Sequence, residues 1–369
     1  MATPLADRLL SGEIAAGLPA LLEPLAGGRL TATRAAAAAI DGQPLSGRAA
    51  LLRDGLSADL PSGLDATERI VTAALEGPEL TGWIVWPLGD LVAARALADP
   101  APDAFERGLD LLAALTGRLT AEFSLRPFLA ADLDRALAVA LGWTADRDEH
   151  VRRLASEGTR PLLPWAPRVP ALTADPRATL PILDALYRDP AEYVRRSVAN
   201  HLNDLSRADA ELAVATAARW LADPDASTDA VVRRALRTLV KRGDPAALEL
   251  RGFGGGDALT VRGPDLDVAA IPAGGEVAFA LVVANGGDRP ARVAIDYVVH
   301  FVKASGATSP KVFKVAEPTL APGQAFETVR RHSFADLSTR RHHPGIHAIE
   351  LQVNGVRHGR AEVELYGDG

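Results

Sequence analysis

Over the first two thirds of the chain, from Leu5 to about Glu249, apolar residues recur at the three- and four-residue spacing of amphipathic helices. Short stretches of Pro, Gly or Asp separate these segments, as expected at helix ends. Outside the repeats described below, the predicted helical segments are Leu5–Ala26, Leu45–Leu56, Ala66–Leu75, Leu80–Leu97, Phe105–Leu119 and Asp132–Leu141. This pattern predicts a mostly α-helical domain.

The clearest helical segment is Asp189–Arg207, and Asp189-Pro190 predicts its start because proline is tolerated in a first turn. Its apolar stripe consists of Val194, Val198, Leu202 and Leu205. Its second face carries Arg196, Asn200, Asn203, Asp204 and Arg207. A merely solvated face would more often carry Lys and Glu. We therefore interpret the second face as a surface that binds a polar ligand.

A Val-Arg-Arg motif occurs three times, beginning at Val151, Val194 and Val232. The offsets, 43 residues (151 to 194) and 38 residues (194 to 232), are close to the ~40-residue period of two-helix solenoid repeats. If the three helices are equivalent, their arginines stack in two columns. The first column is Arg153, Arg196, Arg234 and Arg242, and the second is Arg152, Arg195 and Arg233. We interpret them as an anion-binding face; the alternative is exposed arginine in an arginine-rich composition.

Between the first two repeats lies a proline-rich segment, Ser156–Leu172. Its four prolines prevent helix continuation and favour an extended path. Trp165 stands in the middle of this segment, between Arg160 and Arg168. The tryptophan is either a lid over the core or an aromatic wall that faces a ligand, and spacing alone leaves both interpretations open.

After Leu250 the hydrophobic period drops from 3.6 to 2, which predicts β-strands. Asn354-Gly355 predicts a tight hairpin between the last two strands. The predicted strands are Leu259–Arg262, Leu266–Ile271, Glu276–Asn285, Arg292–Lys303, Lys311–Ala316, Ala325–His332, Gly345–Val353 and Arg357–Tyr366. Their number and shortness favour an immunoglobulin-like sandwich. We predict a helical domain over residues 1–250, a flexible glycine-rich linker over 251–258 and the sandwich over 259–369.

Composition narrows the class of protein. With 48% hydrophobic and 24% charged residues the 369-residue chain resembles an ordinary globular protein, and its net charge of −7 provides no global basic field. The absence of cysteine excludes disulfides and thiolate metal sites and favours the cytoplasm. Asp7 and Arg8 interrupt any signal-peptide core, and no apolar run approaches the ~18 residues of a membrane span. His342, His343 and His347 lack accompanying carboxylates, so we expect no metal site.

The stretches SEGTRPLLPWAPRVP and DPAEYVRRSVANHLNDLSR resemble the HEAT-like-repeat DNA alkylation repair glycosylases, the AlkC/AlkD family. The stretches VVHFVKASGATSPKVFK and STRRHHPGIHAIELQVNG are similar to the AlkC branch, which carries an immunoglobulin-like domain. The resemblance implies an α-solenoid of HEAT-like repeats followed by an all-β sandwich. It implies a monofunctional glycosylase that removes 3-methyladenine, 3-methylcytosine and 1-methyladenine from double-stranded DNA. It also implies recognition in a groove without swinging the base into a deep pocket, unlike most glycosylases.

The same resemblance implies site residues. Trp165 matches the loop aromatic, Asp204 and Glu157 match two acids, and Arg153 matches an active-site arginine; Glu122 in AEFSLRPF is similar to a further acid. From the residues alone, Asp204 is better explained as a cap of the next helix, and Glu157 as the i+4 partner of Arg153.

The chemistry needs no cofactor or metal. A ring-methylated base is cationic and leaves readily, so a carboxylate that stabilises the sugar cation and positions water suffices. An aromatic face adds ~0.5–2 kcal/mol of attraction to the cation. We expect Arg160 and the arginine columns to bind phosphates, and the sandwich edge bearing Lys303, Lys311 and Lys314 to reach DNA. We expect a monomer. The alternative function is a non-catalytic HEAT-type adaptor that binds nucleic acid or protein.

Overall fold

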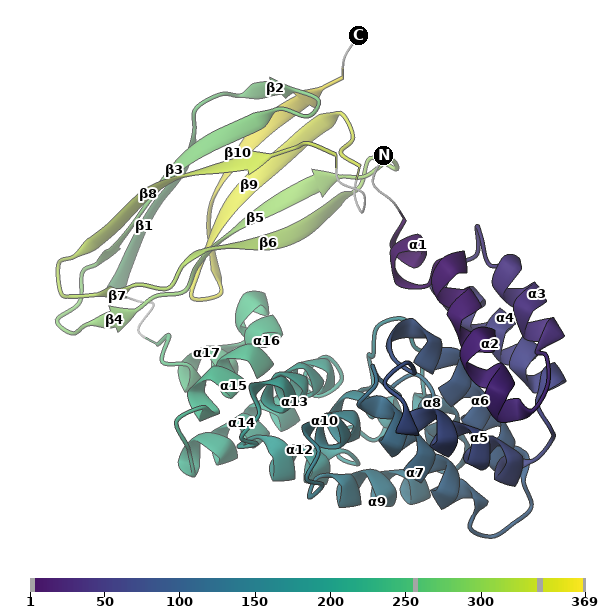
Figure 1. The fold of residues 1–369 in the computed structure, drawn as a ribbon. Helices are drawn as coiled ribbons and strands as arrows, with labels where there is room; N and C mark the ends of the chain where they lie inside the picture. Colours follow the sequence, from purple (N-terminus) through teal and green to yellow (C-terminus); the bar gives the residue numbers. More distant parts are fainter. Residues whose placement is uncertain (1–3, 255–257, 337–340, 368–369) are drawn as a thin grey trace. The chain divides into compact units, whose positions relative to one another are not determined.

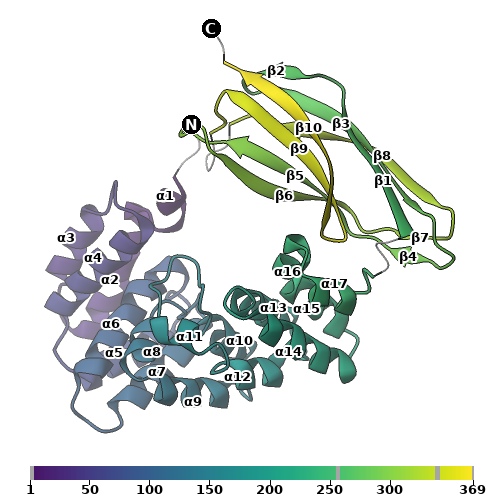
Figure 2. The same cartoon turned by 180° about the vertical axis from the view of Figure 1, so that it is seen from behind.

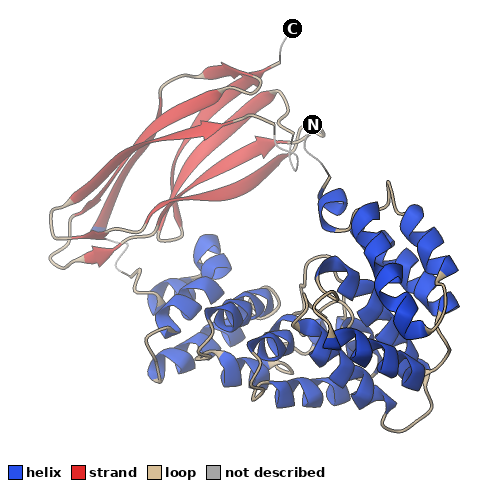
Figure 3. Cartoon of the chain, in the orientation of Figure 1, coloured by secondary structure: helices blue, strands red, loops and turns tan. Residues whose placement is uncertain are grey.

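The structure, a computed structural model, describes residues 4–254, 258–336 and 341–367. The chain divides into two compact units, Met1–Ala235 and Leu236–Gly369. Helices make up the whole regular structure described in the first unit, and all described strands belong to the second (Figures 1 and 3). The chain is therefore mostly α-helical with an appended β-sandwich, as predicted.

The first unit is built from successive short helices, which pack against their neighbours in the chain as HEAT-like repeats do. Their bounds are α1 Leu5–Leu9, α2 Gly12–Ala26, α3 Thr31–Ala38, α4 Leu45–Asp59, α5 Leu64–Glu76, the 3₁₀ turn η1 Gly82–Ile84, α6 Val85–Ala98, α7 Ala104–Thr116, α8 Arg126–Ala131, α9 Leu133–Trp143, α10 Glu149–Glu157, α11 Pro170–Ala174, α12 Leu180–Leu186, α13 Glu192–Leu205, α14 Ala210–Ala222 and α15 Thr228–Ala235. The three Val-Arg-Arg helices, α10, α13 and α15, lie side by side (Figures 1 and 2). This arrangement confirms the predicted repeat.

Helix α13 is the central member of this row. Its apolar stripe is fully buried, with Val194, Val198, Leu202 and Leu205 at 0–1% exposure, as predicted. The helix begins at Glu192 rather than at the predicted Asp189-Pro190. The Asp189 carboxylate instead accepts a hydrogen bond from the Ala191 N–H (2.8 Å) in the turn before the helix.

The second face of α13 corrects the sequence interpretation. Asn203 and Asp204 are buried, and only Arg196 and Arg207 of that polar set are exposed. Since α10 packs on one side of α13 and α15 on the other, most of the helix surface is covered. A spacing argument cannot distinguish a polar residue that meets solvent from one that meets a neighbouring repeat.

The predicted single helix Leu5–Ala26 is two helices, α1 and α2. Ser11 separates them, and its hydroxyl caps α2 by accepting from the Ile14 N–H (3.2 Å). This stretch is long and apolar enough to cross a membrane by length and mean hydropathy (1.3), which corrects the expectation that no run approaches that length. Within the unit 28% of this apolar window is buried, including Leu18 and Leu22 on one side of α2.

The second unit begins with two short helices, α16 Arg237–Arg242 and α17 Pro245–Leu250. Its strands are β1 Leu259–Leu266, β2 Ala270–Pro272, β3 Glu276–Asn285, β4 Ala291–Arg292, β5 Ile295–Val302, β6 Thr308–Ala316, β7 Thr319–Leu320, β8 Ala325–Ser333, β9 Gly345–Val353 and β10 Val356–Tyr366. The described strands pair as β1-β3-β8, β2-β10-β9-β5-β6 and β4-β7. Alternate residues of β3, β5 and β9 fill the core, including Phe279, Val299 and Ile349. The pairing confirms the predicted immunoglobulin-like sandwich.

The predicted hairpin at Asn354-Gly355 joins β9 to β10. Both residues have positive φ (45° and 80°), which a primed two-residue turn requires. At the start of the predicted linker, Phe253 is buried against Leu248 and Ala294. That part of the linker is packed, while residues 255–257 lie outside the described residues.

We predict that Gly355→Ala destabilises the second unit more than Gly306→Ala does. Both glycines have φ near 80°, so each alanine costs about 1 kcal/mol of conformational strain. At Gly355 a Cβ would also come within 2.5 Å of Gly243 Cα, which adds about 1–3 kcal/mol of overpacking. At Gly306 nothing lies within 4 Å. Urea unfolding followed by circular dichroism measures both variants, and equal midpoints would contradict the close approach.

Candidate active site

Three buried carboxylates and two guanidiniums alternate at the junction of α10, α13 and the turn before α8. Arg153 pairs with Glu122 and lies 3.6 Å from Glu157 Oε1. Arg160 Nη1 donates to Glu157 Oε1 (2.6 Å), and Arg160 Nε donates to Asp204 Oδ2 (2.9 Å). We call these five residues the acid–arginine network. Because three acids meet two arginines, the network carries one excess negative charge when all five groups are ionised.

Hydroxyl groups complete the network. Thr120 Oγ1 donates to Glu122 Oε2 (2.8 Å), and Ser197 Oγ donates to Glu157 Oε2 (2.6 Å). Hydrogen bonds to carboxylates strengthen in a low-dielectric environment and hold the oxygens in one orientation. The sequence prediction missed Ser197, although its position directly after the second Val-Arg-Arg motif of α13 was a usable signal.

The environments of Glu122 and Glu157 shift their pKa values in opposite directions. Burial raises the pKa of the Glu122 carboxyl above its ordinary value, by more than the nearby Arg153 charge lowers it. Burial acts in the same sense on Glu157, but the charges of Arg153 and Arg160 and the Ser197 hydrogen bond outweigh it. The pKa of Glu157 therefore lies below its ordinary value. Of the two, Glu157 is the more firmly ionised.

The structure decides between the interpretations left open for two of the acids. Helix α14 is capped by Asp209, whose carboxylate accepts from the Leu212 N–H (2.8 Å), so the capping interpretation of Asp204 is wrong. The contact of Glu157 with Arg153 one turn away exists, but it is one link of a longer chain of charges.

The prediction for Arg160 needs a correction. We expected it to bind DNA, but it is only 8% exposed and its guanidinium bridges Glu157 and Asp204. Taking a guanidinium out of water is costly unless carboxylates surround it, and two do so here. Its role is therefore to hold the two acids together.

Trp165 is 57% exposed and has a left-handed backbone, with φ 65°. Its ring centroid lies 6.2 Å from that of Trp83. Trp83 in turn contacts Trp86, which stacks on Phe123 at 4.2 Å. A side chain this exposed does not act as a lid over the core. Since Phe123 directly follows Glu122 in the chain, the aromatic cluster and the acid–arginine network share one backbone turn.

Two further residues of α13 support the network, and the sequence prediction missed both. The Tyr193 ring has the guanidinium carbons of Arg153 and Arg196 at 5.3 and 5.9 Å from its centroid. His201 is fully buried between the Ser156 carbonyl (2.9 Å) and Thr179 Oγ1 (3.0 Å). Burial lowers the pKa of His201 to about 3, so it is a neutral structural group near neutral pH. Both lie within the repeat helix DPAEYVRRSVANHLNDLSR, but their spacing alone predicts no role.

The two arginine columns are not equivalent surfaces. Arg152 is bound by the Asp189 carboxylate (2.6 and 3.1 Å), and Arg195 donates to the Asp189 and Pro190 carbonyls (2.5 and 2.8 Å). Both therefore hold the turn before α13. In the first column, Arg153 belongs to the acid–arginine network.

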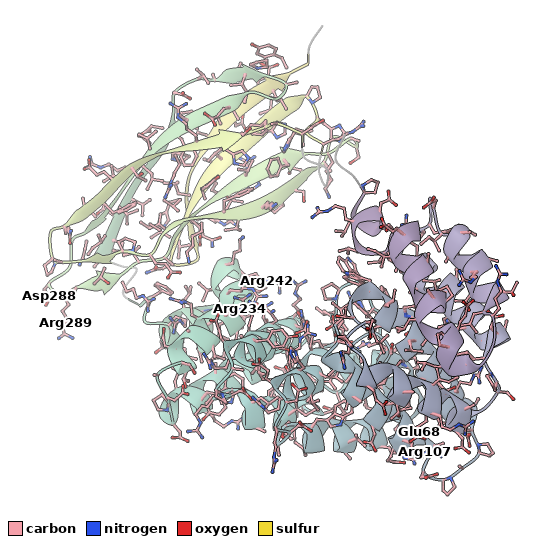
Figure 4. All side chains as sticks on the ribbon, viewed as in Figure 1. Glu68, Arg107, Arg234, Arg242, Asp288 and Arg289 are labelled. Atoms are coloured by element: carbon pink, nitrogen blue, oxygen red, sulfur yellow. The ribbon has the colours of Figure 1, made fainter. Side chains whose placement is uncertain are left out.

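The remaining arginines of the columns are exposed. They are Arg196, Arg233 and Arg234 in the first unit and Arg242 on α16 in the second. Arg234 Nε donates to Asn200 Oδ1 (3.3 Å) across to α13, and Figure 4 shows Arg234 on α15. These four are the column arginines whose exposure suits contact with a ligand.

The three lysines of the sandwich do not lie on one surface. Lys303 is exposed in the turn after β5, and Lys311 and Lys314 are exposed on the edge strand β6. Because strand side chains alternate, Lys311 and Lys314, three residues apart, point to opposite faces. Lys314 pairs with Glu317, and Lys311 lies 5.2 Å from the Phe313 centroid.

A separate hollow of about 530 Å³ lies between α5 and α7. Its lining residues are Asp65, Glu68, Arg69, Thr72, Ala73, Glu76 and Arg107. Arg107 is bound there by Asp65 (2.6 Å) and Glu68, as Figure 4 shows for the latter pair. The charge of Arg107 is therefore neutralised within the hollow. Among the described residues, no group of three or more His, Cys, Asp or Glu is suited to hold a metal ion.

Helical repeats joined to an immunoglobulin-like sandwich define the class of protein, and comparisons place the chain within it. The solved structure of the Pseudomonas fluorescens alkylpurine DNA glycosylase AlkC, bound to DNA containing an abasic-site analogue, matches with a TM-score of 0.87 at 32% identity. The match covers 98% of this chain and 100% of that one.

The uncharacterised protein YhaZ of Bacillus subtilis is 39% identical over 251 residues, which are 68% of this chain and 70% of YhaZ. Residues 260–367 match the family described as the C-terminal immunoglobulin-like domain of YhaZ. The chain belongs to the AlkC/AlkD family of HEAT-like-repeat proteins, in the AlkC branch that carries this C-terminal domain.

We predict opposite pH effects for Glu157→Gln and its matched control Glu122→Gln. At pH values above 4.5, the ordinary pKa of the group, the charge of Glu157 stabilises the fold. This stabilisation is lost as the pH falls through the lower pKa that Glu157 has in the folded protein. Glu157→Gln should cost about 3–5 kcal/mol at neutral pH, as for a broken buried ion pair, and should weaken the loss of stability on acidification.

For Glu122 the sign reverses, because its folded pKa is raised. The stability that Glu122 contributes is fully present below pH 4.5 and is lost as the pH rises through its folded pKa. Because this contribution grows on acidification, Glu122→Gln should steepen the loss of stability on acidification. Urea-unfolding midpoints between about pH 2 and pH 7 measure both slopes, because the Glu157 effect lies below pH 4.5 and the Glu122 effect above it. Slopes that change in the same direction would contradict the assignment.

Proposed function

We propose that the chain is a monofunctional DNA glycosylase of base excision repair, which excises cationic N-methylated bases from double-stranded DNA. The bases are 3-methyladenine, 3-methylcytosine and 1-methyladenine, and no cofactor takes part. The observation that carries the proposal is the acid–arginine network, together with the exposed Trp165 on the segment that also contains Arg160. The likeness over 98% of the chain to a DNA-bound alkylpurine DNA glycosylase supports it.

The reaction is hydrolysis of the N-glycosidic bond. The bond from the sugar C1′ to the base nitrogen breaks, and its electron pair leaves with the base, which becomes neutral. A water oxygen then bonds to C1′, and its proton passes to a carboxylate. In this proposal Asp204 stabilises the developing sugar cation and positions the water, because Arg160 holds its Oδ2 and orients the group.

Glu157 and Glu122 have different parts in the proposal. Glu157, whose pKa is lowered by two arginines, contributes fixed negative charge near the sugar cation. Glu122, whose pKa burial raises, accepts a proton more readily than Glu157. The exposed Trp165 ring attracts the cationic base, and the proposal keeps the expectation that the base is not swung into a deep pocket.

DNA would be held through phosphates by the exposed arginines Arg196, Arg233, Arg234 and Arg242 and, on the sandwich, by Lys303 and Lys311, whereas Lys314 is paired with Glu317. We further propose that the protein acts as a monomer in the cytoplasm. The adaptor alternative is weaker, because a non-catalytic adaptor requires neither three buried carboxylates joined by arginines nor an exposed tryptophan.

Arg196→Ala should weaken binding to damaged and undamaged duplex alike. Each lost phosphate contact should lower the slope of log affinity against log salt by ~0.9. Arg152→Ala is the matched control from the neighbouring position of the repeat. Since Arg152 is bound to Asp189, this variant should lose stability and keep its salt slope. Fluorescence anisotropy at several salt concentrations measures both, and an unchanged slope for Arg196→Ala would count against a phosphate contact there.

Asp204→Asn should lower the single-turnover excision of 3-methylcytosine by roughly 100-fold or more, because it removes charge but keeps shape. DNA affinity should stay near that of the unsubstituted protein. Trp165→Ala should cost less in rate and act most on cationic lesions, since it removes an aromatic face and no charge. Asp209→Asn, which changes a helix cap and keeps its capping ability, is the control and should leave the rate unchanged. A normal rate for Asp204→Asn would remove Asp204 from the proposed chemistry.

A further inference from the structure

The segment that carries Trp165, residues 158–169 between α10 and α11, is held at both ends by one side chain. Arg126, the first residue of α8, donates through Nη1 to the carbonyls of Gly158 (3.1 Å) and Arg160 (2.9 Å). Its Nε donates to the Pro167 carbonyl (3.1 Å). A single planar guanidinium thus ties the start of the segment, which we call the proline loop, to its end.

Arg126 is 2% exposed, and no ion pair joins it to a carboxylate among the residues that the structure describes. Burial, with the nearby charge of Arg168, lowers the pKa of Arg126 to about 10, so the group stays charged near neutral pH. A buried charge that meets only main-chain carbonyls is costly and suits no general role in stability. Its Nε and Nη1 donors are directed to the loop, while Nη2 is buried without a hydrogen-bond partner in the described part of the chain.

The composition of the proline loop explains why such an anchor is required. Pro161, Pro164 and Pro167 have no N–H, so three backbone donors are missing from the loop. Arg168 adds a second side-chain contact by donating to the Pro161 carbonyl (3.1 Å). Side-chain guanidiniums therefore replace the missing backbone donors.

At its tip the loop holds Trp165 in a conformation that a free chain rarely adopts. A left-handed φ of 65° at a non-glycine residue costs energy and persists only where the surroundings impose it. The indole contacts Trp83 through its ring but is otherwise largely exposed, so packing of the side chain does little to impose that backbone. The contacts at the base of the loop are the main constraint on the tip.

We propose that Arg126 is a positioning residue, which holds the proline loop so that the Trp165 indole stands beside Trp83. It touches neither the base nor the sugar and acts through the loop. The inference has a mechanical part, that Arg126 orders the proline loop, and a catalytic part, that this ordering speeds base excision. Only the catalytic part rests on the proposed function.

The mechanical part is tested by hydrogen exchange of the full chain, read by mass spectrometry on peptides that cover residues 158–169. Arg126→Lys keeps the charge. The compact ammonium of lysine, however, cannot donate to three carbonyls in the way that the planar guanidinium does. Exchange in the loop should rise about tenfold or more, the effect of losing one or more charge-assisted hydrogen bonds.

The matched control is Arg48→Lys in α4. Arg48 is equally buried, donates to the Gln43 and Leu10 carbonyls (2.9 and 2.8 Å) and pairs with Asp7. Its substitution should leave exchange in the proline loop unchanged. If Arg126→Lys fails to fold, Arg168→Lys tests the same loop from an exposed position and should raise exchange there to a smaller extent. Loop exchange equal to that of the unsubstituted protein in the folded variant would overturn the proposal.

The catalytic part is tested by a double-mutant cycle on 3-methylcytosine excision. Arg126→Lys alone should slow single turnover about 10- to 100-fold, the effect of a small misplacement of a catalytic group. In a Trp165→Ala background, Arg126→Lys should reduce the single-turnover rate far less, because the side chain that Arg126 positions is gone. Equal losses in both backgrounds would show that Arg126 does not act through Trp165. An inactive unsubstituted protein would refute the proposed function, and the exchange result would still decide the role of Arg126.

Discussion

The alternation of buried acids and arginines between α10 and α13 is the constraint on which the rest of the first unit depends. Each charge in it would be unstable alone, since removing one partner of a buried pair costs several kcal/mol. Arg160 satisfies Glu157 and Asp204 together, and those two acids come from different repeats. The repeats must therefore stack in one register for the charges to be neutralised. This requirement links the position of the carboxylates to the helical packing itself.

The same constraint explains why the candidate chemistry lies in this row of helices rather than elsewhere in the described chain. The apolar stripe of α13 fixes its position, and the polar residues that follow the stripe are then buried against α10. Burial strengthens each electrostatic interaction and separates the pKa values of Glu122 and Glu157. The hollow at Arg107, by contrast, has its charges paired near solvent.

Much of the fold is predictable from the sequence, because period and turn chemistry are local. The strand alternation and the Asn354-Gly355 turn predict the long strands of the sandwich, although the predicted strand Leu266–Ile271 is not one strand and the short β7 is not predicted. The break at Ser11 is missed because the apolar pattern continues through it, although the serine is a good cap. The site is only partly predictable. Trp165 and the acids follow from resemblance, but the bridging role of Arg160 depends on a contact across 44 residues of chain, which no local pattern contains.

The most direct measurement of the central claim is the identity of the products formed by the unsubstituted protein. A duplex that contains one 3-methylcytosine is incubated with the full chain without added cofactor, and the mixture is analysed by mass spectrometry. The account predicts intact free 3-methylcytosine in equal amount to abasic sites in the DNA, with an unbroken strand. DNA that is bound by the protein but keeps its methylated base would contradict the account and favour a non-catalytic adaptor.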